Sequence, residues 1–191
     1  MKRLISFCFM VLCAMTLFAQ KDVTTFLGIP VDGTYSAMRQ KLIAKGFTPL
    51  KIGREECFRG EFNGENVSIM IQTMNNKVYR LNLMDTNGRS ESNIKQRYNT
   101  LVQQFQNNSR YLSTGDQSLS DSENISLEML VHDKQYQAIF FQKPKGDESY
   151  RNSMEIWSNK VVWFTIYREY DNYYIVMNYE NMYNKANGED L

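Results

Sequence analysis

The spacing of apolar residues predicts a helix near the start of the chain. Between Phe26 and Phe47, the residues Tyr35, Met38 and Leu42 recur at i, i+3 and i+7, which places them on one face of a helix of about three turns. The residues around them are typical of a turn, a hydroxyl cap and a glycine stop: Pro30, Asp32-Gly33, Thr34 or Ser36, and Gly46. Turn, cap and burial explain this stretch, so its predicted role is architectural.

The spacing then changes to the alternation of a strand. Residues 55–84 contain Asn63-Gly64 and Asn75-Asn76, two dipeptides that accept the positive φ values of tight turns. Beside these turns apolar and polar residues alternate, as in the run from Val67 to Ile71. This pattern predicts a three-stranded antiparallel meander, with the preceding helix covering one of its faces.

The same order then begins again. Residues Glu91–Asn107 carry an apolar stripe at helical spacing, which predicts a second helix before a polar loop at Ser109–Glu123. Five strands are predicted after this loop, at Ile125–Val131, Tyr136–Gln142, Met154–Ser158, Val161–Arg168 and Tyr173–Tyr179. The chain is therefore predicted to be an α+β protein with its helices packed on one face of antiparallel sheet.

Two units describe this organisation. Residues 20–88 form a first α+β unit and residues 89–191 a second, or both belong to one continuous domain. The segments Lys77–Leu83 and Lys160–Ile166 look internally related, since each begins with Lys-Val and follows an asparagine. Duplication explains this match, and independent use of the same hairpin chemistry explains it equally well.

The N-terminus has the layout of a secretory signal peptide. Lys2 and Arg3 precede an uncharged apolar run from Leu4 to Ala19, which is shorter than the roughly 20 residues of a membrane-spanning helix. Cleavage after Ala19 is expected, which predicts a periplasmic or secreted protein with no membrane span in the mature chain. Lipid attachment at Cys13 is a minor alternative, because the residues before it are not the small ones that a lipoprotein peptidase expects.

Charge and cysteine content narrow the range of functions. Removing residues 1–19 takes two of the 22 basic residues and none of the 21 acidic ones, so the net charge changes from +1 to −1. This balance argues against binding to nucleic acid or to an anionic membrane face. Cys57 is then the only cysteine, so no internal disulfide is possible, and a structural thiol is favoured over a nucleophile.

The motifs of common catalytic and metal sites are missing from the sequence. His132, the only histidine, lies beside Asp133 at a predicted turn, and no G-x-S-x-G elbow or glycine-rich phosphate loop occurs. One histidine and one cysteine cannot build a structural zinc site. Asp85–Gly88 and Asp121–Asn124 offer oxygen ligands for calcium, but neither continues to the glutamate that closes an EF-hand loop. No metal and no cofactor are therefore expected.

Aromatic residues gather near the end of the chain, with nine between residues 157 and 183. On a strand, Trp163 and Tyr167 share one face, whereas Phe164 shares the other with aliphatic neighbours. We expect the Phe164 face in the core, and Trp163 and Tyr167 on a half-exposed aromatic face suited to stacking sugar rings or seating a partner protein. The alternative is that these aromatics only stabilise the sheet through cross-strand pairs.

Three stretches resemble a known group of proteins. Phe26–Gly33 (FLGIPVDG), Lys45–Phe47 (KGF) and Asn187–Leu191 (NGEDL) are similar to a family of uncharacterised secreted proteins from Bacteroidetes, over most of the mature chain. The resemblance brings no catalytic residues with it. The doubled order of helix and strands is also similar, in layout only, to β-lactamase inhibitor proteins and to small envelope lipoproteins of the outer-membrane assembly machinery, whose lipid-attachment cysteine is missing here.

These observations predict an exported, non-enzymatic binding protein of the cell envelope, with Trp163 and Tyr167 as candidate binding residues. Its expected partner is an envelope or secreted protein, or a glycan. Two alternatives stay open. One is an enzyme acting on a glycan or envelope polymer, through carboxylates such as Glu155, Asp171 or Glu180 that the fold brings together. The other is an inhibitor of a secreted enzyme, by analogy with the doubled layout.

Overall fold

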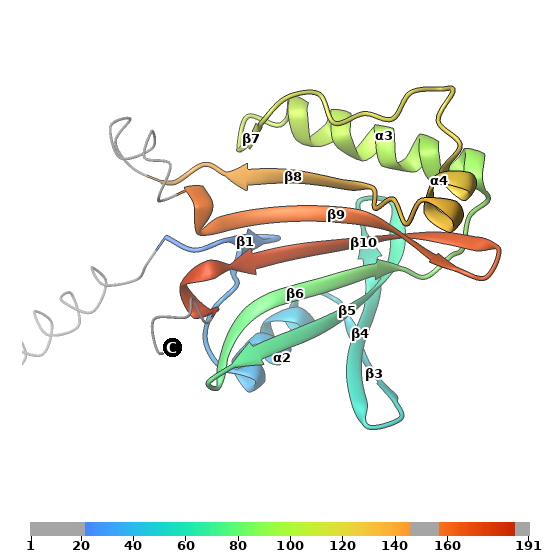
Figure 1. Cartoon of the computed structure of the whole chain (residues 1–191). Coiled ribbons are helices and arrows are strands. Elements are labelled where there is room, and N and C mark those ends of the chain that lie inside the picture. Colours follow the sequence, from blue (N-terminus) through green and yellow to red (C-terminus); the bar gives the residue numbers. More distant parts are fainter. Residues whose placement is uncertain (1–21, 146–156, 186–191) are drawn as a thin grey trace, which may run out of the picture.

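A computed structural model describes residues 22–145 and 157–185, and it confirms the predicted α+β class (Figure 1). Eight antiparallel strands form one sheet in the order β3-β4-β5-β6-β10-β9-β8-β7, and β1 pairs with β2 in a separate hairpin. The strands are β1 (Thr25–Phe26), β2 (Ile29–Pro30), β3 (Thr48–Ile52), β4 (Glu55–Phe62), β5 (Glu65–Met74), β6 (Lys77–Asp85), β7 (Tyr111–Ser113), β8 (Gln137–Gln142), β9 (Lys160–Glu169) and β10 (Asn172–Asn181). The helices are α2 (Tyr35–Ala44), α3 (Glu91–Asn107) and α4 (Ile125–Val131), and a 3₁₀ turn, η1, covers Met182–Asn184.

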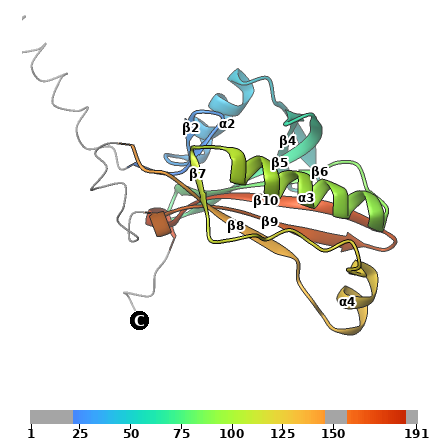
Figure 2. The same cartoon turned by 90° about the horizontal axis from the view of Figure 1, so that it is seen from above.

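The register of the strands decides which side of the sheet is buried. One row of paired residues crosses six strands and is buried throughout: Phe58, Ile69, Leu83, Met177, Phe164 and Ala138. Because side chains alternate along a strand, all of these residues lie on the side of the sheet that faces α2 and α3. Figure 2 shows α3 running along β9 and β10, with α2 at the other end of the sheet.

The opposite side carries no helix in the described part of the chain, and we call it the open face. Side chains from strands at both ends of the sheet point to it: Leu50, Ile52, Met70, Arg80, Asn82, Ile139, Trp163, Tyr167, Tyr174, Asn178 and Glu180. Within residues 22–145 and 157–185, the helices therefore cover only one side of the sheet.

The first predicted helix is confirmed as α2. The Thr34 side chain accepts a hydrogen bond from the Ala37 amide, and Gly46 takes the left-handed conformation (φ 95°) that ends the helix. Met38 and Leu42 are fully buried against the sheet. The spacing of the apolar residues therefore marked the side of the helix that packs.

A charged contact fixes α2 to strand β4. Glu56 accepts hydrogen bonds from the Tyr35 hydroxyl at 2.9 Å and from Arg39 Nε at 3.0 Å. The bond from Arg39, followed by the bond from Tyr35, lowers the pKa of the Glu56 carboxyl. Burial, together with the bond to Glu56, raises the pKa of Tyr35 to about 12. Both groups therefore keep, at neutral pH, the protonation states that this contact needs.

Acid is expected to weaken this attachment of α2. Because the folded protein lowers the pKa of Glu56 below its ordinary 4.5, the charged carboxylate stabilises the fold above that pH, and this stabilisation is lost as the pH falls through the folded pKa. Urea unfolding of the wild type and of Glu56→Gln, from neutral to strongly acidic pH, measures the loss. The wild type should be the more stable at neutral pH and lose that advantage in acid. A difference that is the same at every pH would contradict the prediction.

The second predicted helix is confirmed as α3, with the same bounds. Its apolar stripe is buried, and it comprises Ile94, Tyr98, Leu101, Val102 and Phe105. The Tyr98 ring meets the Phe164 ring edge-on, with ring centres 5.1 Å apart, and Phe105 stacks on Phe140 at 4.6 Å. This aromatic cluster forms the core between α3 and strands β8 and β9.

The strand predicted at Ile125–Val131 is wrong, because these residues form helix α4. The Asn124 side chain caps the helix by accepting a hydrogen bond from the Leu127 amide at 2.9 Å. Ile125 and Met129, four residues apart, pack on the core, whereas Leu127 and Leu130 are exposed. Because Leu127 and Leu130 lie outside the buried helical stripe, the apolar pattern of this segment resembled that of a strand.

Two edge strands were not predicted. β3 contains Pro49 and pairs with β4 from Thr48 to Ile52, and β7 has only three residues inside the predicted polar loop. Short edge strands and edge prolines protect a sheet from pairing with other chains. The predicted strand Met154–Ser158 lies mostly outside the described residues, as does the predicted signal peptide.

Both halves of the chain contribute to one continuous sheet. β6 of residues 20–88 pairs with β10 of residues 89–191, in register from Met84↔Val176 to Arg80↔Glu180. The strand order on one side of this pair, β3 to β6, mirrors the order on the other, β7 to β10. The duplication itself stays a prediction.

Candidate functional site

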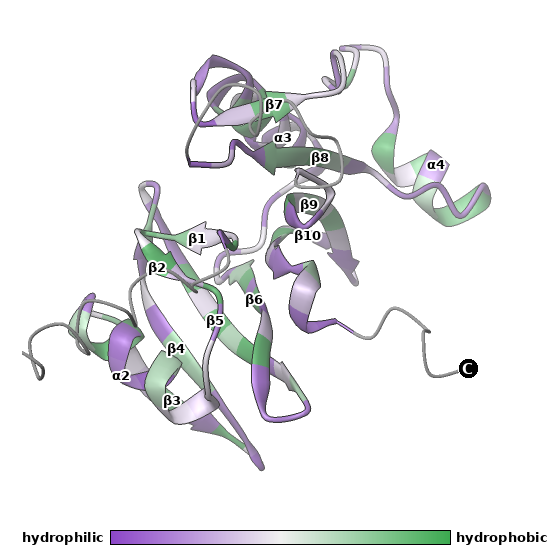
Figure 3. Cartoon of the chain, turned by 90° about the vertical axis from the view of Figure 1, so that its left-hand side faces the viewer, coloured by the Kyte–Doolittle hydropathy of each residue, from purple (hydrophilic) through white to green (hydrophobic). Residues whose placement is uncertain are grey.

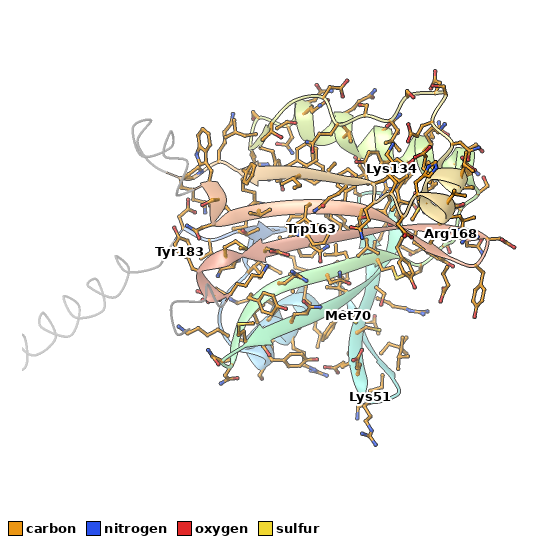
Figure 4. The ribbon with its side chains drawn as sticks, viewed as in Figure 1. Lys51, Met70, Lys134, Trp163, Arg168 and Tyr183 are labelled. Carbon is orange, nitrogen blue, oxygen red and sulfur yellow. The ribbon has the colours of Figure 1, made fainter. Side chains whose placement is uncertain are left out.

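The centre of the open face is a row of five paired residues on neighbouring strands. In register they are Met70, Asn82, Asn178, Trp163 and Ile139. Figure 4 looks onto this face, with Trp163 and Met70 near its middle and Lys51 at the tip of the β3–β4 hairpin. The row brings together side chains that are far apart in the sequence.

Trp163 and Tyr167, the predicted aromatic residues, both point to the open face. Tyr167 is 45% exposed, and its ring centre lies 6.5 Å from that of Tyr174 on the neighbouring strand. Trp163 is half-buried. On the other side of β9, Phe164 and its neighbours Val162 and Ile166 are buried, as expected. A binding role for Trp163 and Tyr167 stays a prediction.

A buried carboxylate holds the Trp163 ring in place. The Glu180 side chain is only 5% exposed, and its Oε1 accepts a hydrogen bond from Trp163 Nε1 at 2.8 Å. The same oxygen lies 2.5 Å from Arg80 Nη2. The Arg80 guanidinium also lies over the Trp163 ring, 5.8 Å from its centre, in a cation–π contact. Trp163 is therefore held by its N–H and by one face of its ring.

Two donors in this cluster have no acceptor among the described residues. Asn82 Nδ2 donates to Asn178 Oδ1 at 2.9 Å, which leaves the buried Nδ2 of Asn178 unpaired, and Arg80 Nε is unpaired as well. Buried donors without acceptors cost stability, and proteins keep them mainly where function requires them. Arg97 and Arg168 also carry buried N–H groups without an acceptor, so such donors are not confined to the open face.

Sequence reasoning missed three polar residues of this site, Arg80, Asn82 and Asn178, and it named Glu180 only as a carboxylate of a possible enzyme. The only signal was their alternation with buried residues, such as Leu81 and Leu83 in β6. Asn82 and Asn178 are 96 residues apart in the chain. Their contact depends on the pairing of β6 with β10, which no local sequence pattern predicts.

The other chemical candidates have structural roles. The exposed His132 lies 3.1 Å from a Glu128 carboxylate oxygen at the end of α4. In the possible calcium loop, the Asp121 and Glu123 carbonyls both accept hydrogen bonds from Lys95 Nζ. Across the two described ranges, no group of three or more histidine, cysteine, aspartate or glutamate residues is arranged to hold a metal ion.

The remaining candidate carboxylates and the cysteine, where the structure describes them, lie apart from one another or are buried. Asp171 lies in the turn before β10 and Glu180 near the end of that strand, so nine residues at about 3.3 Å each separate them by roughly 30 Å. Glu155 lies outside the described residues. Asp85 is buried beside Arg89, 2.9 Å away, and burial raises the pKa of its carboxyl. Cys57 is a buried free thiol.

Comparisons of the chain with protein-family models, with curated proteins and with solved structures give no match. None of the helices in residues 22–145 and 157–185 combines the length and the apolar character needed to cross a bilayer. The candidate site is therefore defined by geometry alone. It is one open face of a single antiparallel sheet, with apolar and aromatic side chains around a polar centre.

Proposed function

We propose that the protein is an exported, non-enzymatic binding protein that seats a partner protein on the open face. The observation that carries this proposal is the exposure of large apolar side chains on that face: Met70 (37%), Leu50 (38%), Tyr167 (45%) and Ile52 (57%). Large apolar side chains that stay exposed together on one face of a folded chain are typical of interaction sites.

The composition of the open face supports a protein partner. Trp, Tyr, Met and Arg are the residues most enriched at protein interfaces, and the face offers Trp163, Tyr167, Met70 and Arg80. The charge of Glu180 is compensated by Arg80 at 2.5 Å and by Lys185 at 3.8 Å. The central surface therefore suits an apolar patch with a few polar groups better than a strongly charged polymer.

A glycan is the less favoured ligand. Stacking of a sugar needs a free aromatic face, but the Arg80 guanidinium lies over the Trp163 ring and Glu180 holds its N–H. Tyr167 and Tyr174 are tilted by 41° to each other and do not form a flat platform. A protein surface can adapt to this uneven arrangement of side chains. A protein is therefore the favoured partner.

The predicted export fits this proposal, because a partner would then be an envelope or secreted protein. An inhibitor of a secreted enzyme is one form of it, in which the captured partner is a hydrolase. That form is supported only by the doubled layout of helices and strands. An assay of the captured partner's activity, with and without the bound chain, distinguishes an inhibitor from a scaffold.

The proposal predicts a face-specific loss of binding. The protein without its predicted signal peptide, carrying a photo-crosslinking amino acid at position 70, should capture a defined protein from the envelope fraction of its own organism. With that protein purified, Met70→Glu and Tyr167→Ala should weaken binding by at least about tenfold. Both changes are on the surface, so the free energy of unfolding should change by no more than about 0.5 kcal/mol.

The matched control is Leu130→Glu, which makes the same apolar-to-acidic change on α4, at a side chain 59% exposed. It should leave the affinity within about twofold of the wild type. If Leu130→Glu abolishes binding and Met70→Glu does not, the partner uses α4 and the proposal fails. Binding of oligosaccharides in place of any protein would replace the proposed ligand class.

A further inference from the structure

A cavity of about 660 Å³ lies on the helix-bearing side of the sheet, away from the open face. It opens between the β1–β2 hairpin, the β4–β5 turn and the C-terminal end of α3 with β7. Figure 3 views the molecule from the left-hand side of Figure 1, with α3 and β7 above β1 and β2. Pockets of roughly 300–1,000 Å³ are typical of small-molecule sites.

The wall of the cavity that is closest to the core is apolar. It is formed by Phe62, Leu101, Phe105, Met177 and the ring of Tyr179. Phe105 is fixed by stacking on Phe140, and Tyr179 by an edge-on contact with Phe26 at 5.1 Å. The wall is therefore preformed and does not depend on a ligand for its shape.

The β1–β2 turn adds an apolar side chain at the mouth of the cavity. Leu27 is 43% exposed and adopts a left-handed backbone conformation, with φ 49°. This conformation is uncommon for residues other than glycine, asparagine and aspartate. The turn thus holds a leucine beside the opening, where a ligand could cover it.

The polar groups at the end of the cavity are paired with each other. Gln142 accepts a hydrogen bond from the Thr25 amide and donates to the Thr25 carbonyl, both at 2.7 Å. Its amide also donates to the Tyr111 hydroxyl at 3.1 Å. Burial and a hydrogen bond to Tyr111 raise the pKa of the Tyr179 hydroxyl, which stays neutral. These groups are neutral and hydrogen-bonded to one another, so this end of the cavity does not require a charged ligand group.

The rim of the cavity is strongly basic. Arg110, Lys143 and Lys145 are exposed at the mouth, and none of them forms an ion pair with another described residue. Among the described residues, the lining contains one acidic residue, Glu61, while the nearby Asp22 carboxylate accepts a hydrogen bond from the Lys145 backbone amide. A fourth cation, Lys160, is buried below them and pairs with Asp22 at 2.9 Å. Clustered cations of this kind attract an anion, and an arginine binds a carboxylate through two parallel hydrogen bonds.

We infer that this cavity binds an amphipathic anion, a carboxylate with an apolar acyl chain. The carboxylate lies at the rim with Arg110 and Lys143, and the acyl chain follows the wall of Phe62, Phe105 and Met177. The inference does not rest on the protein partner proposed above, because the two sites use opposite sides of the sheet.

Calorimetric titration with dodecanoate below its micelle concentration tests this site. Dodecanoate should bind one molecule per chain and raise the unfolding temperature, because ligands that bind only the native state stabilise it. Dodecanol has the same chain without the charge and should bind at least about tenfold more weakly. Equal binding of dodecanol, or no saturable binding of dodecanoate, would overturn the inference.

Charge-reversing variants locate the binding. Arg110→Glu and Lys143→Glu should each weaken dodecanoate binding by at least about tenfold, while Lys51→Glu, a matched reversal at the far tip of the β3–β4 hairpin (Figure 4), should leave it unchanged. The open-face variant Met70→Glu should bind dodecanoate as the wild type does, so this test and that of the protein partner can fail separately. If Lys51→Glu weakened dodecanoate binding as much as Arg110→Glu does, the loss of affinity would come from net charge alone, and the proposed site would be contradicted.

Discussion

Replacing Phe164 with alanine is expected to lower the free energy of unfolding by about 3–5 kcal/mol. Phe164 is fully buried, and its ring centre lies 5.1, 5.9 and 6.0 Å from those of Tyr98, Phe105 and Phe140. Removing the ring leaves a cavity between α3 and the sheet, at the middle of the aromatic cluster. Equilibrium unfolding in urea measures the loss.

Tyr167→Ala is the control for this change, because it removes an aromatic ring from the same strand on the opposite side of the sheet. Its side chain is 45% exposed, so the expected loss is about 0.5 kcal/mol. The comparison tests the assignment of the two faces of β9. Similar losses for Phe164→Ala and Tyr167→Ala would mean that both sides of the strand are packed, and the open face would not exist.

Removing the Glu180 carboxylate is expected to destabilise the fold by about 3 kcal/mol. Glu180→Ala takes away the acceptor of the Trp163 N–H and the counter-ion of Arg80, and it leaves both groups partly buried. Breaking one side of a buried ion pair costs more than the pair contributes, because the remaining charge is desolvated without compensation. Thermal and urea unfolding should both report the loss.

The double variant Arg80→Met with Glu180→Leu separates this explanation from loss of packing. It removes both charges and keeps the side-chain volume, so it should recover most of the stability that Glu180→Ala loses. Trp163→Phe should cost less than Glu180→Ala, since it removes one hydrogen bond and part of a half-buried ring but leaves the ion pair of Arg80 and Glu180 in place. A double variant as unstable as Glu180→Ala would show that the ion pair is not the cause.

The parts of the fold that could be predicted are those set by local periodicity. The stripe from Ile94 to Phe105 has helical spacing and a polar remainder, so α3 was found with its observed bounds. Asn63-Gly64 and Asn75-Asn76 take the positive φ values that their turns require. In β5, the strand between these turns, alternation predicted the buried side correctly up to the register shift after Gln72.

Two kinds of feature could not be predicted. Helix α4 is a seven-residue element whose apolar residues are mostly exposed, so its pattern carries little information about its packing. The cluster of Arg80, Trp163 and Glu180 depends on the pairing of β6 with β10, and a single sequence does not show which strands become neighbours. Trp163 and Tyr167 could be placed on one face, but not the guanidinium that covers the Trp163 ring.

Radical footprinting of the complex is the decisive measurement for the open face. Oxidation of Met70 and Tyr167 is followed by mass spectrometry in the free chain and with the captured partner bound, with Leu130 on α4 as the internal reference. We expect Met70 and Tyr167 to become protected while Leu130 is oxidised as before. Protection of Leu130, with Met70 and Tyr167 oxidised as in the free chain, would contradict the binding role of the open face.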